Sequence, residues 1–69
     1  MTFVGWIELE DKMFMVSKND QNIAIEKYKG GSKVIGSLKS MTKVDFKEFM
    51  NTLNIDTATL PKGILQLLN

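Results

Sequence analysis

The chain has 69 residues, with nine lysines, no arginine and eight acidic residues, which gives a formal charge of +1 at pH 7. A chain of this length predicts one domain, residues 1–69, with a thin core, because small domains bury only about 60% of their unfolded surface. It has no cysteine and no histidine, which excludes disulfides and the usual zinc ligands, so packing or self-association has to supply stability.

The first segment alternates with the period of a β-strand and predicts a hairpin with a turn at residues 10–12. A two-residue loop places odd positions of the first strand opposite even positions of the second. One predicted face carries Phe3, Ile7, Leu9, Phe14 and Val16. The opposite face carries Val4, Trp6, Met13 and Met15.

Residues 22–29 and 32–39 predict a second hairpin around Gly30-Gly31, a pair that suits the left-handed dihedrals of a two-residue turn. Its register pairs Tyr28 with Lys33, Ile25 with Gly36 and Ile23 with Leu38. This register collects Ile23, Ile25, Val34 and Leu38 on one face, which supports it independently of the turn. A glycine inside a strand, here Gly36, indicates a bulge or a close backbone approach.

The pattern changes to helical after Met41. Thr42 is typical of a helix N-cap, and apolar residues then follow at helical spacing up to Leu53, with Asn54 as the expected end. These apolar residues are Phe46, Phe49, Met50 and Leu53. A second short helix is expected from about Thr59, with Pro61 in its first turn.

The order of elements is ββββαα. The predicted fold class is α+β: a small antiparallel four-stranded sheet, or an SH3-like partial barrel, made of two hairpins in residues 1–39. Two short C-terminal helices follow within residues 42–69.

Several classes of function are disfavoured. Without histidine and cysteine, the commonest general base and the thiol nucleophile are missing, so we expect no enzyme, no cofactor, no metal site and no small-molecule substrate. No apolar stretch approaches the ~20 residues of a membrane helix, and residues 1–6 lack the pattern of a signal peptide. We therefore expect a cytoplasmic protein without a membrane partner. The absence of arginine, with many Asn, Ile and Met, indicates an AT-rich genome. A phage or other mobile element is the source we consider for such a regulator, and a viral protein would lie in the host cytoplasm.

The basic residues concentrate in one segment. Residues 27–47 carry six lysines and one acid, so they form a candidate nucleic-acid site. Its proposed members are Lys27, Tyr28, Lys29, Lys33 and Lys39. The alternative interpretation is a solvated face, favoured by the lack of arginine and by Glu26 on the same predicted face as Tyr28.

The first hairpin carries more apolar surface than one layer of helices can cover. The second face must be covered by the last helix, enclosed in a barrel, or bound by another chain. Tryptophan and methionine favour binding surfaces, so we expect a protein partner or a homo-oligomer and a role as a self-associating regulator or inhibitor. The candidate residues are Trp6, Met13, Met15 and Val4, followed by Leu65 and Leu68.

The segment PKGILQLL, residues 61–68, resembles the closing helix of the seven-kilodalton archaeal chromatin proteins. The resemblance implies an SH3-like barrel that binds duplex DNA through a sheet face. It would place Trp6, Met13, Met15 and the hairpin of residues 27–33 at that face. The chain departs from the family in its charge, its lack of arginine and its helical segment at 42–53.

Overall fold

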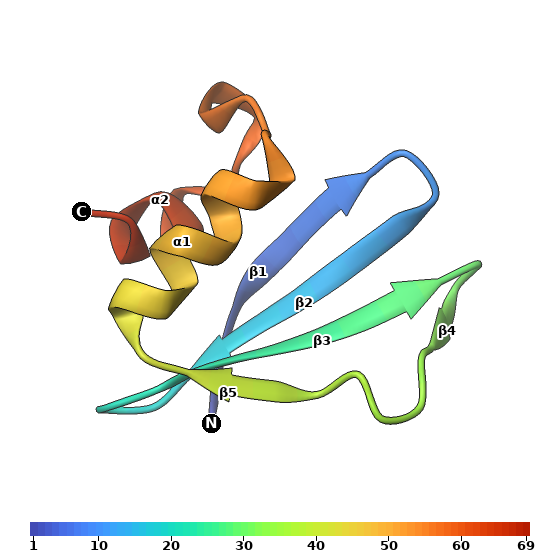
Figure 1. The fold of residues 1–69 in the computed structure, drawn as a ribbon, viewed down its shortest axis with the longest axis horizontal. Coiled ribbons are helices and arrows are strands. Elements are labelled where there is room, and N and C mark those ends of the chain that lie inside the picture. Colours follow the sequence, from blue (N-terminus) through green and yellow to red (C-terminus); the bar gives the residue numbers. More distant parts are fainter.

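The computed structural model describes residues 1–69 and shows a five-stranded antiparallel sheet followed by two short α-helices (Figure 1). The strands are β1 (Thr2–Leu9), β2 (Lys12–Lys18), β3 (Ile23–Lys29), β4 (Ser32–Lys33) and β5 (Lys39–Met41). The helices are α1 (Lys43–Leu53), the 3-10 helix η1 (Thr57–Thr59) and α2 (Lys62–Leu67). β1, β2 and β3 are neighbours, and both β4 and β5 pair with the remaining edge of β3. The predicted α+β order is confirmed, and the sheet is open rather than closed into a barrel.

The first hairpin has the predicted register beyond its first residues, with Ile7 opposite Phe14 and Trp6 opposite Met15. A β-bulge between Phe3 and Gly5 adds one residue to β1. Because side chains alternate along a strand, one added residue exchanges the faces of everything before it. The predicted faces of Phe3 and Val4 were therefore wrong: Val4 packs against the core, and Phe3 lies on the opposite face.

The second hairpin turns at Gly30 and Gly31, both with positive φ, and pairs Tyr28 with Lys33 as predicted. Its predicted register was wrong after that point. Ile25 pairs with Lys39 and Ile23 with Met41, so three residues are inserted relative to the expected pairs.

The three extra residues are accommodated by a turn, residues 34–37, that leaves the sheet between β4 and β5. The Ser37 amide donates to the Val34 carbonyl at 3.2 Å, and Gly36 adopts a φ of +80°. The Ser37 hydroxyl accepts the Lys27 amide at 3.0 Å, which replaces the hydrogen bond that a continuous strand would have made. Leu38 is consequently 63% exposed instead of contributing to the core.

Local hydrogen bonds set the helix boundaries. The Thr42 hydroxyl accepts the Asp45 amide at 3.2 Å, and Asn54 ends α1 in the left-handed region, so both predicted ends are confirmed. The second helix begins at Lys62, later than predicted. Pro61 disfavours helical dihedrals at the residue before it, and Leu60 is accordingly extended.

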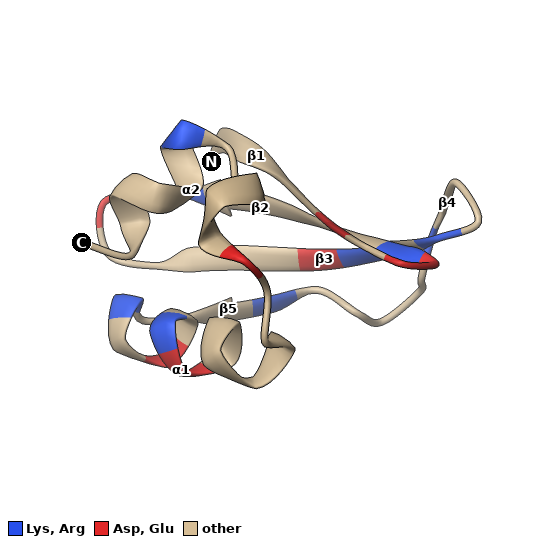
Figure 2. Ribbon diagram, turned by 90° about the horizontal axis from the view of Figure 1, so that it is seen from above, with Lys and Arg blue, Asp and Glu red and all other residues tan.

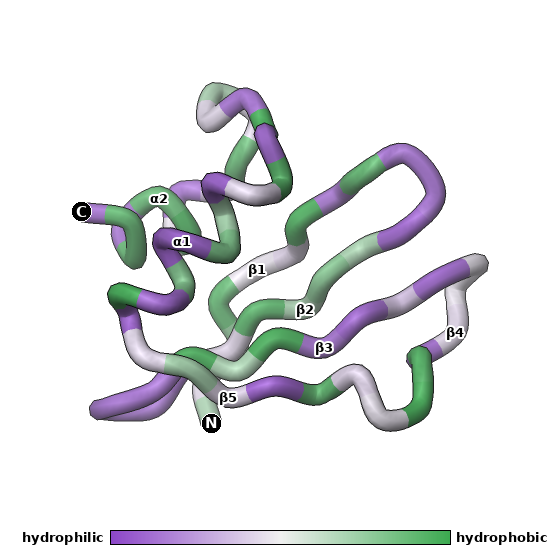
Figure 3. The backbone as a smooth tube through the Cα atoms, viewed as in Figure 1, coloured by the Kyte–Doolittle hydropathy of each residue, from purple (hydrophilic) through white to green (hydrophobic).

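The core lies on one face of the sheet, which we call the inner face. Both helices contribute to it, and Phe46, Ile7, Ile64 and Val16 are its largest fully buried side chains. The helices lie over one end of the sheet, and the β1–β2 and β3–β4 turns extend beyond them (Figure 1). Apolar residues are correspondingly frequent at the helix-bearing end, and polar residues at the two turns (Figure 3). None of the helices combines the length and apolar character needed to cross a membrane.

Candidate interaction surfaces

The sheet face opposite the helices, which we call the outer face, is organised as three rows of side chains. Residues paired across neighbouring strands point to the same side, so the register defines each row. The rows are Phe3–Ser17–Ala24–Ser40, Trp6–Met15–Glu26 and Glu8–Met13–Tyr28–Lys33. Both helices pack on the inner face, so these rows have no covering layer from this chain.

Three aromatic side chains form a connected group on the outer face. The ring centroids of Phe3 and Trp6 are 6.1 Å apart, and those of Trp6 and Tyr28 are 5.1 Å apart in an edge-to-face arrangement. Trp6 and Tyr28 reach each other diagonally across β2, next to Met13 and Met15. All four of these side chains are half-buried, and Phe3 is 54% exposed, so together they present an apolar surface.

The structure brings together some of the predicted interface residues and separates others. Trp6, Met13 and Met15 share the outer face as predicted. Val4 lies on the inner side because of the bulge. Leu65 and Leu68 are half-buried against the core.

Charges on the outer face are few and of both signs. Lys33 Nζ lies 3.5 Å from Glu26 Oε2, and the Glu26 side chain is only 13% exposed. Glu8 is exposed on the edge strand β1 and makes no ion pair. Charged residues of both signs lie toward the hairpin turns of the sheet and also on α1 (Figure 2).

The predicted nucleic-acid residues are divided between the two faces. Tyr28 and Lys33 lie on the outer face, because they pair directly. The other three predicted residues, Lys27, Lys29 and Lys39, lie on the inner face. Lys12, which was not part of the prediction, lies on this face as well. Lys29 is within 3.8 Å of Asp11 at the neighbouring turn, and both side chains are exposed.

A cavity of about 390 Å³ opens on the inner face, between α1 and the turn of residues 34–37. Its lining is mostly apolar and includes two lysines. The ten lining residues are Phe14, Ile25, Val34, Ile35, Met41, Phe49, Gly36, Ser37, Lys27 and Lys39. The rings of Phe14 and Phe49 are 5.5 Å apart and nearly perpendicular.

Two features of these surfaces were absent from the sequence-based prediction. Phe3 was assigned to the inner face, although Gly5 within the strand was a signal for the bulge that moved it. The cavity depends on the three-residue shift in the last strand pairing, for which Gly36 was the only sign. No group of three or more acidic residues is arranged to hold a metal ion.

No protein-family model matches this chain, and no curated protein or solved structure matches it either.

Proposed function

We propose that this protein is a non-enzymatic binding module that pairs with a second copy of itself through the outer face. Such a self-associating module fits a role as a small regulator or inhibitor of other proteins. The observation that carries the proposal is the connected Phe3, Trp6 and Tyr28 group, beside two methionines, on the face that both helices leave uncovered. Aromatic and methionine side chains are enriched in the buried centres of protein interfaces.

A protein partner suits this face better than a nucleic acid does. Single-stranded nucleic acids need stacking rings and cations on the same surface. Here the rings lie on the outer face with Glu8, Glu26 and a single lysine, Lys33, which pairs with Glu26 and so leaves no free cation for a phosphate. Four lysines lie instead on the inner face: Lys12, Lys27, Lys29 and Lys39.

The arrangement of the rows favours a second copy as the partner. Two copies placed face to face can be related by a two-fold axis close to the strand direction, as in aligned sheet packing. Rotation about this axis reverses the order of the strands in each row. Glu8 therefore lies opposite Lys33 of the second copy, and Met13 lies opposite Tyr28. In the next row, Met15 lies opposite Glu26 of the second copy, because these residues belong to β2 and β3, which the axis exchanges.

The same axis also matches side-chain sizes in the third row. Phe3 lies opposite Ser40 of the second copy, and Ser17 lies opposite Ala24, so a large side chain meets small ones. An axis perpendicular to the strands would instead place Glu8 over Phe3 and leave its carboxylate without a partner, which is costly in an interface. The axis along the strands is therefore preferred.

The size of the patch limits the affinity. The three rows span roughly 20 Å in each direction, from spacings of about 4.8 Å between strands and about 3.4 Å along them. Roughly 400 Å² per copy is below the ~800 Å² of a standard interface, so we expect a dissociation constant in the micromolar range or above.

The test is the mass of the protein as a function of concentration, measured by sedimentation equilibrium from about 1 μM to about 1 mM. Met15→Glu would place a carboxylate opposite Glu26 of the second copy on both sides of the two-fold axis, and like charges in contact cost several kcal/mol, so we expect about 100-fold weaker association. Val44→Glu is the matched control, because Val44 is 66% exposed on α1, away from the outer face.

The proposal predicts a dimer for the native chain and for the Val44 variant, and a monomer for the folded Met15 variant. Circular dichroism would establish that each variant is folded. A native chain that remains monomeric at about 1 mM contradicts the proposal. Equal masses for the two folded variants would contradict it as well.

A further inference from the structure

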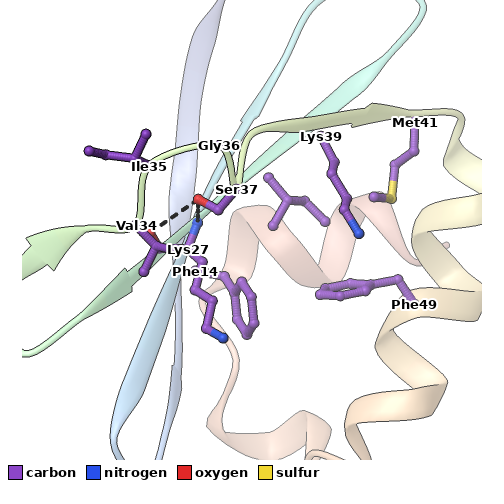
Figure 4. A pocket seen from close by; sticks show the side chains of 10 residues that line it. Phe14, Lys27, Val34, Ile35, Gly36, Ser37, Lys39, Met41 and Phe49 are labelled. Carbon is purple, nitrogen blue, oxygen red and sulfur yellow. Dashed lines mark hydrogen bonds between the residues drawn. The ribbon is translucent and has the colours of Figure 1, made fainter.

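The inner-face cavity lies where α1 stops covering the sheet. Phe49 of α1 forms one wall, Phe14 and Ile25 of the central strands form the floor, and the turn of residues 34–37 forms the opposite rim (Figure 4). Ile35 at the tip of this turn lies on the rim of the cavity and is 96% exposed. The volume of the cavity, about 390 Å³, is within the usual range for small-molecule sites.

Two ammonium groups border this apolar space. The side chains of Lys27 and Lys39 extend toward the aromatic rings, Lys27 alongside Phe14 and Lys39 above Phe49 (Figure 4). Neither lysine forms an ion pair, and no acidic residue lines the cavity. Lys12 and Lys29 lie on the same face and add to the positive potential.

We propose that this cavity binds a small amphipathic anion, meaning an apolar ring or chain that bears one carboxylate or phosphate. The apolar part would replace water against the two phenyl rings and Met41, a burial that contributes about 25 cal/mol per Å² of apolar surface. The anionic group would lie between the Lys27 and Lys39 ammonium groups, which have no competing carboxylate partner. Either feature alone gives weak binding, because an anion without an apolar body leaves the floor hydrated and a neutral molecule leaves the lysines unpaired.

The geometry of the rim supports the same site. The turn is held to β3 through Ser37, whose hydroxyl accepts the Lys27 amide at 3.0 Å, so the backbone beside the first lysine is fixed. Lys39 begins β5 directly beyond the turn and pairs with Ile25 of the floor. The two lysines are therefore placed by the same structural feature that opens the cavity. This site is on the opposite face from the proposed dimer interface, so either proposal can fail without the other.

The experiment is an NMR titration of the native chain with decanoate and decyl phosphate below their critical micelle concentrations, with decanol below its aqueous solubility, and with inorganic phosphate. We expect both anions to shift signals of Phe14, Met41 and Phe49, and to bind at least about fivefold more tightly than decanol. Inorganic phosphate should produce no comparable shifts. The ratio of the two anion affinities distinguishes a carboxylate ligand from a phosphate ligand.

Lys39→Met retains the apolar stem and removes the charge, so it should weaken decanoate binding about fivefold and leave decanol binding unchanged. Lys62→Met in α2 is the matched control and should bind decanoate like the native chain. The proposal is overturned if decanol binds as tightly as decanoate, or if inorganic phosphate alone causes the same shifts. Equal decanoate affinities in the two variants, or shifts that avoid these three residues, would also overturn it.

Discussion

Gly63 of α2 lies directly against Val4 of the β1 bulge. A Cβ atom at Gly63 would be 3.1 Å from Val4 Cγ1 and 3.2 Å from the Val4 carbonyl oxygen. The bulge turns Val4 toward the helix, and the absence of a side chain at Gly63 allows the helix to approach. Gly5 makes a similar approach to Pro61, so the start of α2 packs closely on the start of β1.

Gly63→Ala should destabilise the protein although alanine is the better helix former. Helix propensity favours alanine by about 1 kcal/mol. Overpacking against Val4 costs about 1–3 kcal/mol, because the backbone oxygen cannot move away as a flexible side chain could. We expect a net loss of about 1 kcal/mol in the free energy of unfolding, measured by urea denaturation. Gln66→Ala on the exposed side of α2 is the control, and a more stable Gly63 variant would contradict the close packing.

Ser37→Ala should destabilise the protein through the backbone of β3. The variant leaves the half-buried Lys27 amide without its acceptor at 3.0 Å, which costs about 1–2 kcal/mol. Ser40→Ala is the matched control in β5, because its side chain is exposed and outside the hydrogen bonds of the sheet. Thermal unfolding followed by circular dichroism would compare the two, and equal midpoints would show that the Ser37 bond contributes nothing.

Charge reversal tests the direction of the proposed two-fold axis. Glu8→Lys and Lys33→Glu each place like charges opposite one another in the dimer, so each single variant should associate at least about fivefold more weakly. The double variant restores opposite charges at both of the contacts between positions 8 and 33 that the two-fold axis creates. It should therefore recover most of the native affinity. Sedimentation at low salt measures all three. Double-variant affinity no higher than that of the weaker single variant would exclude this axis.

Two asparagines, Asn51 inside α1 and Asn54 just after its end, should respond oppositely to glycine. Asn54 has a φ of 52°, which glycine adopts freely, so Asn54→Gly should raise stability by up to about 1 kcal/mol. Asn51 lies within the helix, where glycine costs a few tenths to 1 kcal/mol. Denaturant unfolding of both variants checks this pair. Loss of stability in the Asn54 variant would contradict a left-handed end to α1.

Local sequence determined much of the fold. The Gly30-Gly31 pair positioned a turn through its left-handed dihedrals, Thr42 supplied a hydroxyl for the start of α1, and alternation placed Ile7 and Phe14 on one face. These features depend on residues that are neighbours in the chain or across one tight turn. The shared face of Trp6, Met13 and Met15 was predictable for the same reason.

Tertiary structure decided on which face of the sheet several side chains lie, because residues inserted into a strand can exchange these faces. The bulge at Val4 brings this residue against Gly63 of α2. The turn at Gly36 brings the Ser37 hydroxyl to the Lys27 amide, which donates a hydrogen bond to it. Both features therefore depend on partners that are distant in the sequence. Each insertion exchanged faces: the first moved Phe3 to the outer face, and the second brought Lys39 to the cavity. The sequence by itself determined the order of strands and helices, the turn of the first hairpin and both ends of α1. Long-range packing decided which side chains share a surface, because strand register is set by contacts that local pattern does not encode.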